Sequence, residues 1–263
     1  MMDDLLAAGA LELDLDEAIA RFRADGWARV GRVASERTLA ELRARVDRMM
    51  LGELVYPGLF FQRDTETGAY EDLTYGRGWE GPTLNYRKLE KVEQDPHFRA
   101  WLSNPVFERV ARALIPGAIS LYRAVVFNKA ATGGTVLPFH QDGGLFWGVD
   151  RAPFLQIWTA LDDCPVEAGC VEVVPGTHRG GLATPPGGRV PEDLVRAADV
   201  EPRVVPLPAR AGDVLLIHNF VWHRSGRNVT GAFRRALTAC YMTAETRCVR
   251  RKRAPRQFFR VWD

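Results

Sequence analysis

The sequence predicts a mainly β protein whose second half is a sandwich or barrel, with α-helices ahead of it in the chain. From about residue 117 short β-rich runs alternate with Gly/Pro turns, and no long helix interrupts them. The residues before this point carry helical apolar spacing. The 263 residues are 46% hydrophobic and 26% charged, which is the composition of an ordinary globular domain.

The N-terminal part predicts two helices. In "DEAIARFRADG" the apolar side chains recur at helical spacing and the pattern stops at Gly26. A second helix follows Ser35, which is a suitable N-cap. Its apolar face consists of Leu39, Leu42, Val46 and Met49. A stripe of this kind is typical of core packing, so neither helix is assigned a function.

The next two segments differ in composition and in the spacing of their apolar residues. Residues 56–86 are rich in Gly, aromatic and charged residues without a period, which is typical of a functional loop, and we expect them to cover the substrate. Residues 95–115 resume a helical pattern that is interrupted at Pro105. We therefore expect one domain over residues 1–263. It would comprise mostly helices and a lid loop (1–115), a β core (116–245) and a C-terminal tail (246–263) whose basic run at 250–253 is solvated.

The charge balance favours a small-molecule ligand. With 35 basic and 33 acidic residues the formal charge is only +2, so no overall field attracts nucleic acid or an anionic membrane. No apolar run is long enough to span a membrane, and the acidic start is unlike a signal peptide, so we expect a cytoplasmic protein. The four cysteines fit no paired zinc pattern and are expected to be free thiols.

The stretch "PFHQDG" holds the first candidate for chemistry. In a strand, His140 and Asp142 project from the same face, either as a chance pair on a solvated strand or as two arms of a metal site. His223, far along the chain, completes two histidines and one carboxylate. That set is the facial triad of non-haem Fe(II) oxygenases, which leaves coordination positions open, whereas a structural zinc site closes its coordination.

Four motifs in order carry a family resemblance: "FHQDGG", "WTALDDCPVEAGCVEVVPGTH", "AGDVLLIHNFVWHRSGRN" and "FRRALTACY". Together they resemble the phytanoyl-CoA dioxygenase family of Fe(II)- and 2-oxoglutarate-dependent oxygenases, and the similarity spans nearly the whole chain. The resemblance implies a double-stranded β-helix, the cupin-like jelly-roll, with N-terminal flanking helices. It implies Fe(II), held by His140, Asp142 and His223, together with 2-oxoglutarate and O2.

The same resemblance implies further site residues. Arg234 matches the arginine that binds the distal carboxylate of 2-oxoglutarate, for which a guanidinium fork is suited, and Ser225 matches the hydroxyl beside it. The other implied co-substrate residues are Trp158, Asn128 and Lys88. The neighbouring Arg235 is a rival for Arg234, but strand alternation sends only one of the two inward.

Two histidines compete with those of the triad, and both are assigned structural roles. His218 precedes the motif that contains His223, so we expect it in a pocket wall or the core. His178 in "PGTHR" is expected in a turn between strands, and His97 beside Pro96 on the surface.

The sequence indicates the chemical character of the substrate site but does not identify the substrate. Arg123 and the "GGLFWG" segment with Phe146 and Trp147 are expected to face it, which suggests an anionic or polar group near an aromatic wall. The resemblance implies hydroxylation with release of succinate and CO2. Because Asp142 is present, halogenation, which needs a small residue there, is disfavoured, while desaturation and ring closure stay open. Alternatives are a metal-containing jelly-roll that only binds a ligand and a cupin-type isomerase.

Overall fold

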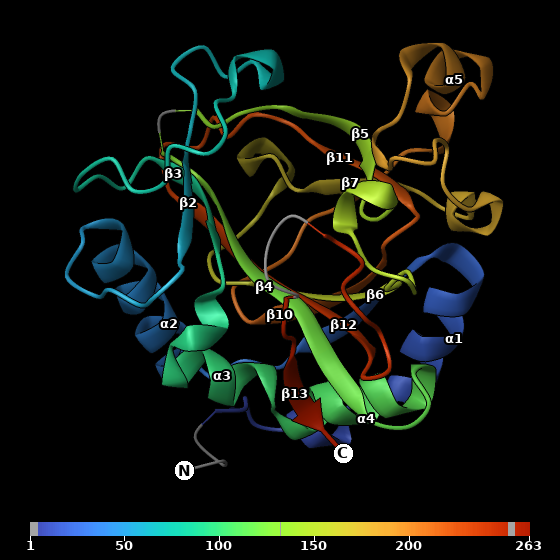
Figure 1. Ribbon diagram of the computed structural model, residues 1–263, viewed down its shortest axis with the longest axis horizontal. Coiled ribbons are helices and arrows are strands. Elements are labelled where there is room, and N and C mark those ends of the chain that lie inside the picture. The colour runs from blue at the N-terminus through green and yellow to red at the C-terminus, as the bar shows by residue number, and fades with distance from the viewer. Residues whose placement is uncertain (1–4, 132, 252–255) are drawn as a thin grey trace.

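Two antiparallel β-sheets lie face to face in the computed structural model, which describes residues 5–131, 133–251 and 256–263 (Figure 1). The larger sheet has the strand order β1-β10-β6-β12-β4-β3-β2, with β13 pairing beside β4. The smaller sheet has the order β8-β5-β11-β7-β9. Strands far apart in sequence are neighbours in both sheets, which confirms the predicted jelly-roll class of fold.

The strands of the larger sheet have these bounds: β1 Trp27–Arg32, β2 Phe60–Arg63, β3 Tyr86–Glu90, β4 Ile119–Lys129, β6 Leu155–Ala160, β10 Asp213–His218, β12 Arg234–Thr243 and β13 Phe259–Trp262. Those of the smaller sheet are β5 Leu137–Gln141, β7 Val171–Val174, β8 Gly188–Arg189, β9 Val205–Leu207 and β11 Trp222–Ser225. The helices are α1 Leu15–Asp25, α2 Glu36–Met50, α3 Pro96–Leu102, α4 Pro105–Leu114 and α5 Glu192–Ala197.

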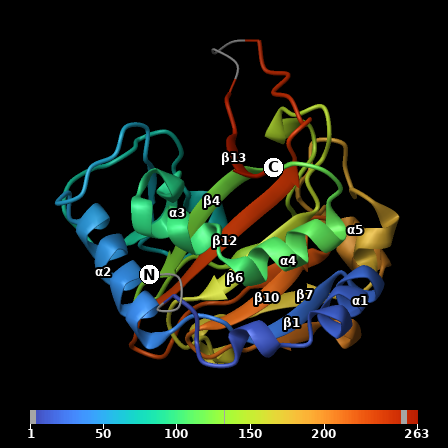
Figure 2. The same cartoon turned by 90° about the horizontal axis from the view of Figure 1, so that it is seen from below.

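Helices α1 to α4 cover the outer face of the larger sheet, whereas α5 lies near the smaller one (Figure 2). Their starts are fixed by capping side chains: Asp14 accepts hydrogen bonds from two backbone amides of α1, and Ser35 accepts one from Thr38. The predicted helices before Gly26, after Ser35 and on either side of Pro105 are confirmed.

The protein has apolar packing on both sides of the larger sheet. The main core fills the space between helices and sheet, with Phe22, Leu39 and Trp101 fully enclosed. A second cluster, including Trp158, Val173 and Leu215, lies between the two sheets. Because the space between the sheets is only partly filled by this cluster, polar side chains of the inner faces line cavities there.

Residues 1–115, which were expected to be mostly helices and a lid loop, also contain strands. Three strands, β1, β2 and β3, come from this part and extend the larger sheet at both edges. β1 separates α1 from α2 and pairs with β10. β2 lies inside the segment 56–86 that was expected to be irregular. Short strands such as these are stabilised by partners distant in sequence, so local pattern gives little sign of them.

The C-terminal tail is also more ordered than expected. Strand β13 pairs with β4, and Trp262, only 8% exposed, stacks on Tyr241 with 5.3 Å between ring centroids. Of the basic run at 250–253, residues 252 and 253 lie outside the described residues. All four cysteines are free, as predicted. Within the described ranges, no helix has the length and apolar character needed to cross a membrane.

Candidate active site

Neighbouring strands of the smaller sheet bring the two histidines of the proposed triad together. His140 on β5 and His223 on β11 are direct cross-strand partners, and their ring centroids lie 4.0 Å apart. Asp142 follows the end of β5, where its backbone amide donates to Asn219 at 2.8 Å. Since cross-strand partners project to the same face, both imidazoles point at one spot between the sheets.

Backbone carbonyls orient both imidazole rings. Nδ1 of His140 lies 2.9 Å from the carbonyl of Pro138, and Nδ1 of His223 lies 2.9 Å from that of Val221. With Nδ1 donating to a carbonyl, each neutral ring presents the lone pair of Nε2. This is the arrangement by which proteins fix the tautomer of a metal-binding histidine.

The carboxylate of Asp142 is held from two sides. Its Oδ1 accepts a hydrogen bond from Arg123 at 3.1 Å, and its Oδ2 accepts one from Gln156 at 2.6 Å. Burial opposes ionisation of Asp142, but the Arg123 guanidinium and the two imidazoles outweigh it and hold the pKa of the carboxyl below its usual range. Burial and the neighbouring His223 lower the pKa of His140 to about 4. At neutral pH the triad therefore offers the neutral imidazole of His140 and the carboxylate of Asp142, beside the imidazole of His223.

This donor set fits a divalent first-row metal, with a small adjustment. Nε2 of His223 and Oδ2 of Asp142 lie 3.9 Å apart. Two ligands at about 2.1 Å from a metal and at right angles are about 3 Å apart, so closure needs a shift of less than about 1 Å. In agreement with this wider spacing, no group of three His, Cys, Asp or Glu side chains in the described part of the chain is already closed enough to hold an ion.

A pocket of about 710 Å³, which we call the inner pocket, extends from the triad between the sheets. Arg234, at the start of β12, lines it and is only 3% exposed. Its guanidinium donates to the carbonyl of Gly169 and lies 5.9 Å from the ring centroid of Trp158. Trp158 and Ser225 also line this pocket. Three of the five predicted co-substrate residues thus lie together beside the triad, and a fourth, Asn128, also lines the pocket.

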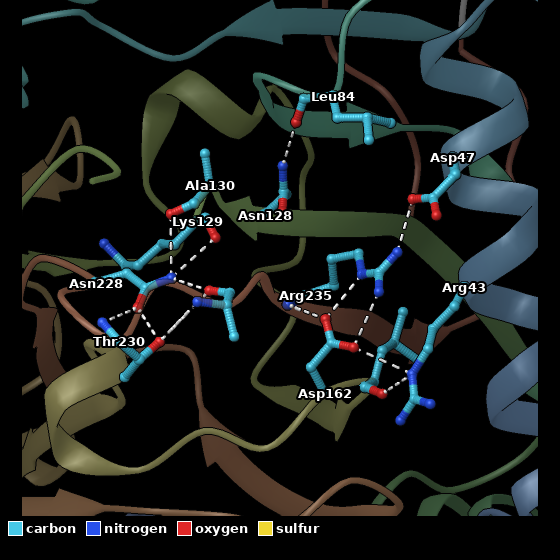
Figure 3. Close-up of polar contacts among 12 residues, drawn as sticks. Arg43, Asp47, Leu84, Asn128, Lys129, Ala130, Asp162, Asn228, Thr230 and Arg235 are labelled. Atoms are coloured by element: carbon cyan, nitrogen blue, oxygen red, sulfur yellow. Dashed lines mark hydrogen bonds and ion pairs between the residues drawn. The ribbon is translucent and has the colours of Figure 1, made fainter. Parts of the chain in front are cut away.

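Arg235 points the other way. Its guanidinium binds Asp162 through two hydrogen bonds of 2.7 and 3.0 Å, and Asp47 of α2 at 2.6 Å (Figure 3). Asn128, the cross-strand partner of Arg235, borders the inner pocket, but its amide donates to the carbonyls of Leu84 and Tyr86 at 2.9 Å. Its amide nitrogen therefore supports the start of β3 and is not free for a ligand.

The sequence reasoning missed two basic residues of the inner pocket, Lys129 and Arg87. Strand alternation along β4 from Arg123 would have indicated Lys129 in place of Asn128, since every second residue shares a face. It also missed Gln156, which shares a face with Trp158 two residues further on and holds Asp142. No pattern distinguishes Arg87 from its neighbour Lys88.

A second cavity of about 550 Å³, the outer pocket, adjoins the other side of His140 and Asp142. Lys88, predicted to lie near the co-substrate, lines this cavity, is absent from the lining of the inner pocket, and forms an ion pair with Glu90. Arg123 lines it as well and bonds to Asp142. The remaining lining residues are Gln62, Tyr70, Tyr75, Arg87, Phe127, Leu137, Pro138 and Arg189. Gln62, Tyr70 and Tyr75 come from the segment that was expected to cover the substrate.

The two predicted aromatic substrate residues lie elsewhere. Phe146 is 69% exposed, and Trp147 stacks on Tyr122 with 4.2 Å between ring centroids. Neither lines the inner or the outer pocket, because the helical turn Leu145–Trp147 carries them away from the triad. Trp147 still contributes indirectly, since the guanidinium of Arg123 lies 4.5 Å from its ring centroid.

The rival histidines are packed away from the triad. His218 lies among Phe22, Phe154 and Phe220, and its Nδ1 accepts a hydrogen bond from the backbone amide of Phe220 at 3.0 Å. Burial and the nearby His178 lower its pKa to about 4. His178 is buried beside it, with 4.9 Å between ring centroids. His97 is exposed on α3.

The chain is similar to known proteins in family, in sequence and in fold. The family described as Phytanoyl-CoA dioxygenase (PhyH) matches residues 22–236. The chain is 30% identical to phytanoyl-CoA dioxygenase domain-containing protein 1 of Danio rerio over 159 residues, which cover 57% of this chain and 54% of the relative. The match therefore spans about half the length of that relative.

Two solved structures are similar in fold. The non-haem α-ketoglutarate-dependent epimerase SnoN from nogalamycin biosynthesis has 23% identity and a TM-score of 0.67, with 91% of this chain and 87% of that chain covered. The carbocyclase SnoK from the same biosynthesis has 25% identity, a TM-score of 0.66 and the same two coverages.

Proposed function

Because the chain belongs to the phytanoyl-CoA dioxygenase family, whose cofactors are Fe(II), 2-oxoglutarate and O2, we propose that it is an oxygenase that hydroxylates an anionic small molecule and releases succinate and CO2. One observation supports the proposal most. The triad of His140, Asp142 and His223 opens into the same pocket as Arg234, a buried guanidinium that has no carboxylate within 4.0 Å among the described residues.

The triad residues would hold the metal. Bound Fe(II) would supply the redox chemistry that couples oxidative decarboxylation of 2-oxoglutarate to oxidation of the substrate. His140 and His223 would offer Nε2, with the carbonyls of Pro138 and Val221 fixing their rings. Gln156 and Arg123 would keep Asp142 ionised and turned toward the metal.

The inner pocket suits the co-substrate. Arg234 would bind the distal carboxylate of 2-oxoglutarate through its guanidinium fork, with the Ser225 hydroxyl beside it. Trp158 would form an apolar wall along the co-substrate's carbon chain. Since this pocket lies between the sheets, it would also keep water from the reacting atoms.

The outer pocket suits an anionic substrate. It is lined by four basic residues, Arg87, Lys88, Arg123 and Arg189, and its one acidic lining residue, Asp142, is the proposed metal ligand. Glu90 balances part of this charge through Lys88 and Arg123. A carboxylate or phosphate on the substrate would find complementary charge here, with Tyr70 and Tyr75 beside it. A cytoplasmic location stays a prediction.

The experiment is Fe(II)-dependent formation of succinate from 2-oxoglutarate, followed with a panel of anionic small molecules and their neutral analogues. We expect an anionic compound to stimulate succinate formation, with a mass gain of one oxygen in the product. His223→Ala should abolish the reaction, whereas the matched variant His218→Ala should retain it if it folds. A protein that binds 2-oxoglutarate without ever converting it would instead be a ligand-binding protein. Isomerisation without consumption of 2-oxoglutarate would indicate a cupin-type isomerase.

The type of oxidation can be identified only from the mass of the product. The two similar structures are described as an epimerase and a carbocyclase, so succinate release alone does not identify hydroxylation. A product of unchanged mass would favour epimerisation, and a loss of two hydrogens would favour desaturation or ring closure. Either result would refute hydroxylation and retain the oxygenase class.

A further inference from the structure

Two buried cations face each other across adjacent strands in the inner pocket. Lys129 at the end of β4 is the direct cross-strand partner of Arg234 at the start of β12. Lys129 is 5% exposed and Arg234 is 3% exposed. In the described ranges of the chain neither has a carboxylate within 4.0 Å. Like charges directly opposite each other destabilise a sheet, and burial increases the cost.

The backbone around Lys129 is firmly held. The side-chain amide of Asn228 donates to the carbonyls of Lys129, Ala130 and Ala232, and so ties the end of β4 to the loop that precedes β12 (Figure 3). These bonds keep the backbone of Lys129 opposite that of Arg234, and the Lys129 amine is itself held by the carbonyl of Thr135. Any relief of the repulsion must come from a change of charge or from a ligand.

The surroundings of the Lys129 amine favour its uncharged form. Nζ donates one hydrogen bond, to the carbonyl of Thr135 at 2.6 Å. Arg234 faces it from β12 and Arg87 from β3, while Asp64 after β2 and Cys164 after β6 are the other ionisable groups near it. Asp64 forms no ion pair with it. Burial, followed by the charge of Arg234, lowers the pKa of Lys129 well below its usual value.

An incoming carboxylate would reverse this balance. Nζ has donors beyond the one bound to Thr135, since an ammonium carries three. A guanidinium stays protonated in proteins, so of the two cations only Lys129 can change its charge. A carboxylate bound at Arg234 would bring negative charge next to Lys129 and favour the ammonium form.

We propose that Lys129 is a second anchor for the distal carboxylate of 2-oxoglutarate, uncharged in the ligand-free protein and protonated from solvent as that carboxylate binds. The amine gains one proton and no other bond forms or breaks. This inference rests on the proposed function, because it needs 2-oxoglutarate in the inner pocket. It predicts that 2-oxoglutarate affinity rises as the pH falls between the pKa of the Lys129 amine in the complex and its lower pKa in the ligand-free protein, since binding consumes a proton.

Calorimetry of ligand binding tests the proton directly. The protein is loaded with Mn(II), to prevent turnover, and titrated with 2-oxoglutarate in buffers of different ionisation enthalpy; the slope of the observed enthalpy gives the protons exchanged. The reference ligand is 2-oxopentanoate, which has the same chelating end but no distal carboxylate. We expect 2-oxoglutarate to take up close to one proton more than this reference.

Variants assign the proton to Lys129. Lys129→Met should abolish the difference between the two ligands and weaken 2-oxoglutarate binding about 10- to 100-fold, as expected for losing a hydrogen bond to a charged group. Lys129→Arg, which stays charged, should also abolish the extra proton while retaining more of the affinity. Lys91→Met, outside both pockets, is the matched control and should behave as the wild type.

The outcomes separate the two proposals. Equal proton uptake with both ligands in the wild type, or an extra proton that persists in Lys129→Met, would overturn the role of Lys129. If Lys129→Met does not fold, Lys129→Arg takes its place, and an extra proton that persists in Lys129→Arg would overturn the role of Lys129. If the metal-loaded wild type does not bind 2-oxoglutarate at all, the proposed function fails with it.

Discussion

Replacing Arg234 by Met should weaken 2-oxoglutarate binding, whereas replacing the adjacent Arg235 by Met should lower the stability of the protein. Met keeps part of the aliphatic stem and removes the charge. Arg234→Met should weaken 2-oxoglutarate binding by about 2–5 kcal/mol, or about 30- to 5,000-fold in Kd, because a charge-assisted pair in a secluded pocket is lost. Arg235→Met should leave this Kd unchanged, because its guanidinium binds Asp162 and Asp47 on the other side of the sheet.

Arg235→Met should lower the free energy of unfolding, whereas Arg234→Met should not. Arg235 makes two hydrogen bonds to Asp162 and one to Asp47, in a partly exposed network, so its loss should cost about 1–3 kcal/mol. At this chain length that is a decrease of roughly 2–4 °C in Tm for each kcal/mol. Arg234 has a buried Nε without a partner and lies opposite Lys129, so Arg234→Met should leave the Tm of the ligand-free protein unchanged or raise it.

The assays are calorimetric titration of the Mn(II)-loaded variants with 2-oxoglutarate and thermal denaturation without ligand. Equal losses of 2-oxoglutarate affinity in the two variants would refute the assignment of Arg234. A marked loss of stability in Arg234→Met, with little in Arg235→Met, would refute the argument that an unpaired buried cation is retained for its ligand.

Three further changes test the site and the packing around it. Asp142→Ala should lower iron affinity and substrate oxidation by orders of magnitude without gain of chlorination, measured by metal titration and product mass; near-wild-type coupled turnover would mean that the carboxylate is not a required ligand. Gln156→Leu removes the 2.6 Å hydrogen bond to Asp142 and should weaken metal binding about 10- to 100-fold, whereas unchanged affinity would leave Arg123 as the sufficient support. The pKa of His218 is lowered to about 4 in the folded protein, so the unfolded chain binds its proton first and stability should fall by on the order of 2 kcal/mol as the pH drops from about 6.5 toward 4. This is checked by measuring the denaturation midpoints of the wild type and His218→Asn over this pH range. If stability depends on pH equally in both proteins, His218 is not the cause of the loss.

Much of the site was predictable because its chemistry depends on residue type and spacing. An imidazole and a carboxylate two residues apart in a strand share a face whatever the rest of the fold, so His140 and Asp142 could be paired from the sequence. The order of the later motifs, by resemblance, then selected His223 over His218 and Arg234 over Arg235. The helices after Asp14, Ser35 and Asn104 were equally local, because caps and apolar period lie within one segment.

Substrate-side residues were less predictable, because turns and bulges between strands decide where side chains point. Phe146 and Trp147 follow Asp142 closely in sequence, yet a helical turn carries them outside both pockets. Arg87 and Lys88 both border the outer pocket, although simple alternation would separate them. No local pattern distinguishes these outcomes.

The sequence by itself predicted the proposed metal-binding set, the proposed co-substrate arginine and the helices, because each prediction depends on residue type at short spacing or on the order of motifs. Only the tertiary structure decided which side chains meet across strands. The pairing of β4 with β12 places Lys129 opposite Arg234, and the pairing of β13 with β4 buries Trp262. Strand register is set by packing between segments more than a hundred residues apart, so a buried charge without a partner becomes visible only once the sheet is formed.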